Sequence, residues 1–173
     1  RIDWTGKVNL LPERLIDPLK WRKPERVFVN SQSDLFHDQV PDEYIAEVFA
    51  VMAAAPRHTF QLLTKRHGRM RSLLSSFGFH ATVDHLALGQ HGVIDMPWPL
   101  PNVWLGVSAE DAQWAKIRGD ALRDTPAAVR WFSCEPLLGA IDALDLKAID
   151  WVVVGGESGP GARPMQPGWA RSL

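Results

Sequence analysis

The sequence predicts an α/β protein built on a parallel sheet. Short runs of β-branched, aromatic and other apolar residues recur along the 173 residues, and helical patterns separate them. These runs are near-continuously apolar, which is typical of strands buried on both faces. Strands that alternate with helices form parallel βα units joined by right-handed crossovers. About six such units predict a partial parallel (β/α) barrel, with an open doubly wound parallel sheet as the alternative.

The predicted strands follow one another at short intervals, and each is bounded by polar residues, glycine or proline. They lie at 7–11, 26–30, 60–64, 103–108, 129–133 and 151–156.

Four segments between these strands have helical patterns. Residues 41–55 begin with Pro41 and carry apolar residues three and four positions apart. Ser108 and Asp111 have the spacing of a capping box at the start of residues 109–123, which place Trp114, Ile117 and Ala121 on one face. The other two predicted helices are 66–76 and 12–20, of which Pro18 ends or kinks the second.

Residues 77–102 contain several glycines and prolines, which predict an irregular insertion. We interpret residues 1–173 as a single α/β domain and as a fragment of a longer barrel, because the chain starts on Arg1 without methionine and stops at "WARSL".

Composition narrows the classes of function. The formal net charge of −1 excludes a global field that recruits nucleic acid or an anionic membrane, so such a contact needs a local patch. The single cysteine, Cys134, excludes an internal disulfide and a cysteine-ligated metal site built from this chain alone. His80, His85 and His91 match no zinc motif, and we expect no metal site. With no membrane span or signal peptide, we expect a soluble, cytoplasmic protein.

Polar residues and glycines follow most of the predicted strands, where parallel α/β proteins bind their ligands. Glycines allow a ligand to approach the backbone, and a carboxylate accepts hydrogen bonds from an amine or hydroxyls. We therefore predict one ligand site at this rim. Its members are Asn30, Ser31, Ser33 and Asp34 after the second predicted strand; Lys65 and Arg66 after the third; Ser108 and Glu110 after the fourth; Glu135 after the fifth; and Gly155, Gly156, Glu157 and Ser158 at the sixth.

The same residues have plainer structural interpretations, which remain open at this point. Ser108 can be an N-cap, Asp34 a turn anchor, Lys65 and Arg66 a solvated helix start, Glu135 a loop acid, and the glycine pair a tight turn.

One short segment is a candidate contact for nucleic acid. Trp21 lies among Lys20, Arg22, Lys23 and Arg26. An aromatic ring that stacks on a base, beside cations that contact phosphates, is the usual arrangement for binding single strands.

Six strings, in order and along nearly the whole chain, resemble a bacterial and phage-associated family of unknown function that carries a three-cysteine motif and is similar to radical S-adenosylmethionine enzymes. They are "DWTGKVNLLPERL", "PLKWRKPERVFVNSQSDLFHDQVPDEYI", "HTFQLLTKRHGRM", "PLPNVWLGVSAED", "FSCEPLLGAID" and "DWVVVGGESGPGARPM".

The resemblance implies a partial barrel, a 4Fe-4S cluster on three cysteines and S-adenosylmethionine as its fourth ligand. It places the methionine amino group near Gly155, Gly156 and Glu157, although the superfamily carries this motif on an early strand. The three cysteines of the family lie upstream of Arg1, and the chain contains only Cys134. As written it holds neither cofactor and is expected to be inert in radical chemistry.

We therefore interpret the chain as the core of a radical S-adenosylmethionine-like enzyme of unknown substrate, with nucleic-acid modification as one use. No catalytic residue is assigned. The cofactor would be bound by Asn30, Ser31, Ser33, Asp34, Gly155, Gly156, Glu157 and Ser158, and the substrate by Lys65, Arg66, Ser108, Glu110, Glu135 and Arg163. The alternatives are a non-catalytic module that binds nucleic acid or a partner, and a cluster-free enzyme that uses Glu135 and Glu157 as acid and base.

Overall fold

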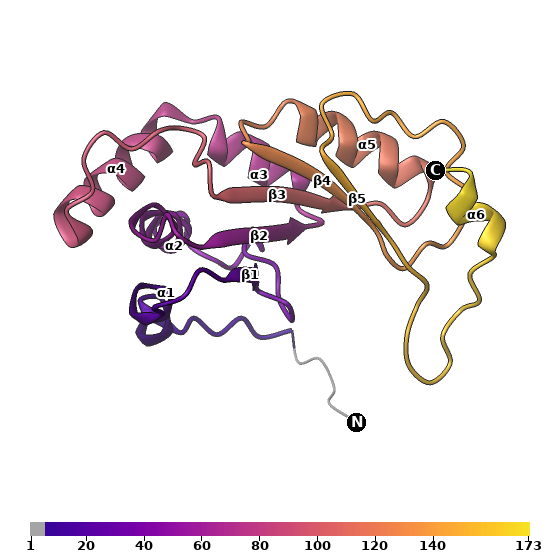
Figure 1. Ribbon diagram of the computed structural model, residues 1–173, viewed down its shortest axis with the longest axis horizontal. Coiled ribbons are helices and arrows are strands. Elements are labelled where there is room, and N and C mark those ends of the chain that lie inside the picture. Colours follow the sequence, from indigo (N-terminus) through magenta and orange to yellow (C-terminus); the bar gives the residue numbers. More distant parts are fainter. Residues whose placement is uncertain (1–5) are drawn as a thin grey trace.

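The computed structural model describes residues 6–173, which form one all-parallel sheet with helices packed against it (Figure 1). Neighbouring strands follow the order of the sequence from β1 to β5. The strands are β1 (Arg26–Val29), β2 (Thr59–Thr64), β3 (Val103–Ser108), β4 (Val129–Cys134) and β5 (Trp151–Val154). The predicted parallel α/β architecture and five of its strands are confirmed.

The predicted strand at 7–11 is wrong. These residues have no regular secondary structure and pair with no strand of the described sheet. Val8 packs against the core, whereas Leu11 is 53% exposed and precedes the short helix η1 (Pro12–Arg14). Apolar content alone does not make a strand, because a strand also needs a neighbour for its backbone hydrogen bonds.

Most predicted helices form with shifted ends. The 12–20 segment divides into η1 and α1 (Asp17–Lys20), with Pro18 in the first turn of α1, where its missing N–H costs nothing. Residues 41–55 form α2 (Asp42–Ala54), and 66–76 form α3 (His67–Leu74).

The helix predicted at 109–123 is α5 (Ala112–Arg123). It begins later than expected because Asp111, rather than Ser108, caps it by accepting a hydrogen bond from the Trp114 amide at 2.9 Å. Its buried face also differs from the prediction, since Ile117 is 41% exposed and Arg118 is buried.

The expected irregular insertion at 77–102 is wrong for its first half, which is α4 (Phe77–His91). Ser76 caps its start, Gly92 ends it in the left-handed conformation, and Phe79, Val83 and Ala87 form its buried stripe. The helix was not predicted because the glycines within the segment have a low helix propensity. Residues 92–102 are irregular, and α6 (Pro167–Arg171) follows β5.

The two faces of the sheet differ sharply. Phe60, Leu62, Leu105 and Phe132 point toward the helices and are at most 2% exposed. Figure 1 shows α3, α4 and α5 along this side. The opposite face carries the four aromatic residues Phe28, Trp104, Trp131 and Trp151, of which Phe28 and Trp151 are 43% and 41% exposed.

The described sheet is open, with β1 and β5 at its edges. A doubly wound sheet reverses its strand order at a switch point, and no such reversal occurs among these five strands. The carboxyl ends of all five strands lie at the same edge, which positions the candidate site.

Candidate functional site

A cavity of about 420 Å³ lies at the carboxyl end of β1. Residues 6–11 form one wall, and the loop after β1 forms another. Three of the predicted cofactor residues, Asn30, Ser33 and Asp34, line it, whereas Ser31 does not. Asn30 has a φ of 60°, which asparagine tolerates better than most residues, and its Nδ2 donates to Ser33 Oγ at 2.8 Å.

Asp34 connects the end of β1 to the end of β2. Its carboxylate accepts from Thr64 Oγ1 at 2.7 and 2.9 Å, from the Lys65 amide at 3.0 Å and from the Phe36 amide at 3.0 Å. Asp34 therefore anchors the turn after β1 to the end of β2, and this turn forms one wall of the cavity.

Lys65, Glu110 and Arg118 extend this network to the end of β3. Lys65 Nζ donates to Glu110 Oε1, and Arg118 Nη1 donates to Glu110 Oε2 at 2.7 Å. Burial raises the pKa of Glu110, but the Lys65 hydrogen bond and the positive charges of Arg118 and Lys65 outweigh it, so the pKa lies below its ordinary value.

Sequence reasoning missed Arg118. Its side chain is 7% exposed, it donates to the Ser108 carbonyl at 2.9 Å, and its guanidinium lies 4.1 Å from the Trp114 ring. The available signal was the spacing of Trp114 and Arg118, four positions apart on one helix face.

Ser108 and Arg66 hold structural positions at this edge. Ser108 is buried at the end of β3, opposite Ser133 on β4. The Arg66 amide donates to Thr64 Oγ1 at 2.8 Å, and the residue precedes α3. The solvated helix start is therefore the closer description of Arg66.

The chain's own Glu135 fills the space above Gly155. A Cβ on Gly155 would lie 2.9 Å from Glu135 Cδ, so the glycine admits this side chain. The Leu137 amide donates to the Gly155 carbonyl at 2.8 Å, and the Leu138 amide donates to the Glu110 carbonyl at 2.8 Å. These two backbone hydrogen bonds fix the loop that begins at Glu135 against the ends of β5 and β3. Gly155 is therefore explained by its packing against the Glu135 side chain.

Glu157 and Arg163 pair with each other in the loop that follows β5, and Ser158 is exposed in the same loop. Arg163 Nε and Nη2 each donate to the carboxylate at 2.8 Å. These bonds, together with one from the Arg163 amide, lower the pKa of Glu157 to about 2. The hypothesis of a cluster-free enzyme requires Glu157 to act as a general acid or base. A carboxylate with so low a pKa is poorly suited to that role near neutral pH.

The residues present do not fit an iron-sulfur cluster. Cys134 is fully buried on β4, and burial, followed by the charge of Glu110, raises the pKa of its thiol to about 11. Such a thiol is a buried apolar group rather than a thiolate ligand. Residues 6–173 contain no group of three or more His, Cys, Asp or Glu side chains placed to hold a metal.

Gly155, Gly156 and Glu157 do not fit an S-adenosylmethionine amino group as they stand. Arg163 occupies both oxygens of Glu157, Glu135 lies against Gly155, and Met165 Cβ would lie 3.4 Å from a Cβ on Gly156. Any bound amine would have to displace one of these contacts.

The basic segment lies at the other edge of the sheet, where the strands begin. A cavity of about 600 Å³ is lined there by Trp21, Arg22, Lys23 and Arg26, with Glu25 as an acidic neighbour. Trp21 is 38% exposed, and the Arg26 guanidinium lies 5.8 Å from the Trp104 ring.

Lys20 differs from the rest of the predicted basic segment. It pairs with Asp17 at 3.0 Å and is not among the residues that line this cavity.

No helix within residues 6–173 combines the length and the apolar character needed to cross a bilayer. Fold and site together define a parallel α/β protein with a partly polar cavity at the carboxyl edge of its sheet. The chain belongs to DUF5131, a family of proteins of unknown function whose model matches residues 1–173. No curated protein and no solved structure matches it. The similarity to radical S-adenosylmethionine enzymes and the phage association stay predictions.

Proposed function

We propose that this chain is the ligand-binding core of a partial (β/α)-barrel enzyme, and that a small polar molecule binds at the carboxyl end of β1. The cavity of about 420 Å³ beside Asn30, Ser33 and Asp34 carries this proposal. It lies where parallel α/β proteins place their ligands, and its volume falls within the range of small-molecule sites.

Strand order supports the barrel part of the proposal. Strands that follow one another without reversal, with helices packed against one face, are arranged as in part of a barrel wall. The helix-free face, with Trp104, Trp131 and Trp151, is then the interior of the barrel.

The chemistry of the cavity favours a ligand rich in hydroxyl groups, such as a nucleoside. The Asn30 amide and the Ser33 hydroxyl supply donors and acceptors, and Asp34, fixed by Thr64, positions the loop that carries them. Lys65 places a half-exposed cation beside this loop. Radical chemistry is what the resemblance implies, and its cluster ligands would have to come from outside these 173 residues.

Binding of a nucleoside is testable by NMR. We expect adenosine and S-adenosylmethionine, added separately to ¹⁵N-labelled protein, to shift the amide signals of residues 30–37 and 64–66. Asn30→Gly should weaken binding by about tenfold, because it removes the side-chain carboxamide, whereas glycine readily adopts the positive φ of this position.

The matched control is Gln90→Ala, at an exposed position of α4 that does not line the cavity, and it should bind like the unmodified chain. Shifts absent with both probes, or unchanged by Asn30→Gly, would reject this site.

A second candidate function is binding of single-stranded nucleic acid by Trp21, Arg22, Lys23 and Arg26. The observation that favours it is the cavity these residues share, with an exposed tryptophan and cations at the same edge. Base stacking and phosphate contacts need this combination.

Fluorescence anisotropy with a labelled oligothymidylate strand tests this second function. We expect affinity that falls steeply with salt, and the double variant Arg22→Ala, Lys23→Ala to lower it by about tenfold. The control is Lys116→Ala, Lys147→Ala, which removes the same charge from exposed sites elsewhere. Binding that is insensitive to salt, or equally weakened by both double variants, would exclude it.

A further inference from the structure

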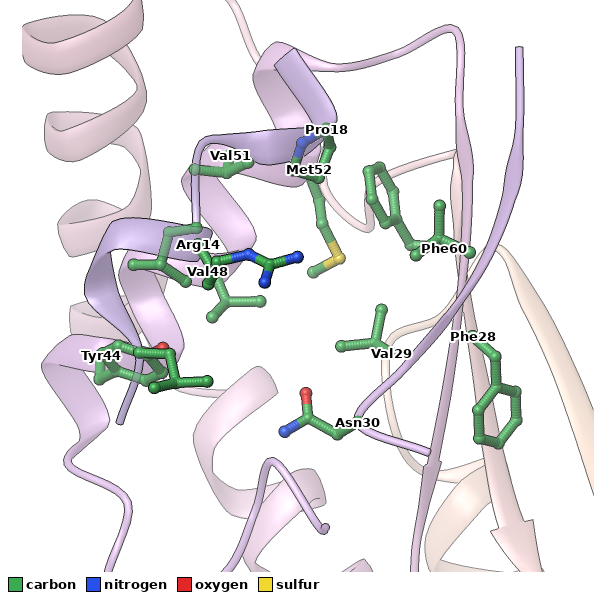
Figure 2. Close-up of a pocket in the computed structure, with 13 residues that line it drawn as sticks. Arg14, Pro18, Phe28, Val29, Asn30, Tyr44, Val48, Val51, Met52 and Phe60 are labelled. Carbon is green, nitrogen blue, oxygen red and sulfur yellow. The ribbon is translucent and has the colours of Figure 1, made fainter. Parts of the chain in front are cut away.

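A second cavity, of about 250 Å³, adjoins the candidate site and lies between β1, α2 and the segment of η1 and α1 (Figure 2). Its walls are largely apolar and include Val29, Val48, Met52 and Phe60. Residues of this kind gain from contact with an apolar group rather than with water.

Arg14 is the cation of this cavity. Figure 2 shows its guanidinium directed into the space between Met52 and Val29, with the Asn30 side chain on the far wall. Arg14 Nε donates to Asp17 Oδ2 at 2.5 Å. Its two terminal nitrogens make no hydrogen bond to the part of the chain that the structure describes, and the side chain is 72% exposed.

Arg14 shares its acidic partner with a second cation. Asp17 is shared, because its second oxygen accepts from Lys20 Nζ at 3.0 Å. These hydrogen bonds from Arg14 and Lys20 keep the pKa of Asp17 below its ordinary value. Among these three side chains, one carboxylate between two cations leaves one net positive charge. Glu13 and Glu47 lie close enough to act on Tyr44 of the cavity wall, so the contact with an anion depends on the terminal nitrogens of Arg14 rather than on the overall charge.

We propose that this cavity binds a short apolar carboxylate, with its hydrocarbon chain against Val48 and Met52 and its carboxylate on the terminal nitrogens of Arg14. A volume of about 250 Å³ equals about eight water volumes, so a ligand of about eight non-hydrogen atoms fits. Hexanoate has this size. The site lies on the helix side of β1 and adjoins the cavity proposed for the nucleoside, with which it shares Leu11, Asn30 and Tyr44. Arg14, Val48 and Met52 line this cavity and not the other, so variants at these positions test the carboxylate site without altering the nucleoside site.

Methyl NMR tests the site with hexanoate and with hexan-1-ol, which has the same chain without the charge. We expect hexanoate to shift the methyl signals of Met52 and Val48, and to bind about tenfold more tightly than the alcohol. Arg14→Met should remove this preference while leaving the binding of the alcohol within about twofold, because the substitution keeps an unbranched chain.

Two further variants complete the test. Lys116→Met removes an exposed cation from α5 and should leave hexanoate binding unchanged. Val48→Phe fills the cavity and should block both probes. Arg14 is exposed, so Arg14→Met remains informative even if Val48→Phe fails to fold. The proposal is wrong if hexanoate causes no methyl shifts, if the alcohol binds equally well, or if Arg14→Met binds hexanoate like the unmodified chain.

Discussion

Arg118→Met is expected to lower the free energy of unfolding by about 3 kcal/mol. Arg118 and Glu110 have side chains only 7% and 10% exposed, and their contact is 2.7 Å long. Removal of the guanidinium leaves a buried carboxylate with Lys65 as its remaining cation, and it also removes the donor to the Ser108 carbonyl. Urea denaturation followed by circular dichroism measures the loss.

The effect of Arg118→Met should depend on pH in a defined direction. In the unmodified chain the pKa of Glu110 is lowered, so its stabilising contribution is present above the ordinary pKa and is lost as the pH falls through the lowered one. In the variant, burial is less opposed and the pKa of Glu110 rises. Protonation then neutralises the buried carboxylate that has lost Arg118, so the destabilisation should be smaller at pH 4 than at pH 7.

Two controls separate this buried pair from a general loss of charge. Arg71→Met breaks an exposed pair with Asp124 at 3.4 Å and should cost less than about 0.5 kcal/mol. Glu110→Leu combined with Arg118→Met should cost less than the sum of the single variants, because no buried charge is left alone. If Arg71→Met and Arg118→Met lowered the free energy of unfolding equally, the buried Glu110–Arg118 pair would contribute no more to stability than an exposed pair, and the prediction would be wrong.

Gly106→Ala is expected to destabilise the fold by about 1–3 kcal/mol. A Cβ at this position would lie 2.3 Å from Trp131 Cε2 and 2.6 Å from Trp131 Cδ2. The indole cannot bend away, because it is 3% exposed and packs against Trp151 with ring centroids 5.2 Å apart. The free energy of unfolding and the near-ultraviolet circular dichroism of the tryptophans should both change.

Gly89→Ala is the matched control, since no atom beyond its chain neighbours and the backbone of its own helix lies within 4 Å of its Cβ position in α4. It should be neutral or stabilising by up to about 1 kcal/mol, through helix propensity. Trp131→Leu should cancel most of the additional cost of Gly106→Ala, because the two side chains compete for one space. Additive losses in that double variant would contradict the proposed clash.

Five strands and the helix near 41–55 were predictable because their signals are local. Val103–Ser108 and Trp151–Val154 are apolar runs of strand length, and the apolar spacing in α2 is that of a helix. The failures have equally physical causes. Residues 7–11 have strand composition but pair with no strand among residues 6–173. α4 contains glycines, which have a low helix propensity, although its buried residues have helical spacing.

The sequence by itself determined that polar side chains follow parallel strands, and therefore that Asn30, Asp34, Lys65, Glu110 and Glu135 lie toward one edge. Only the tertiary structure decided which of them remain available to a ligand. Asp34 is bonded to Thr64, Glu110 to Arg118, and Glu157 to Arg163, while Glu135 occupies the space that Gly155 leaves open. Strand polarity follows from chain direction and local pattern, but the pairing of side chains depends on distances between segments far apart in sequence.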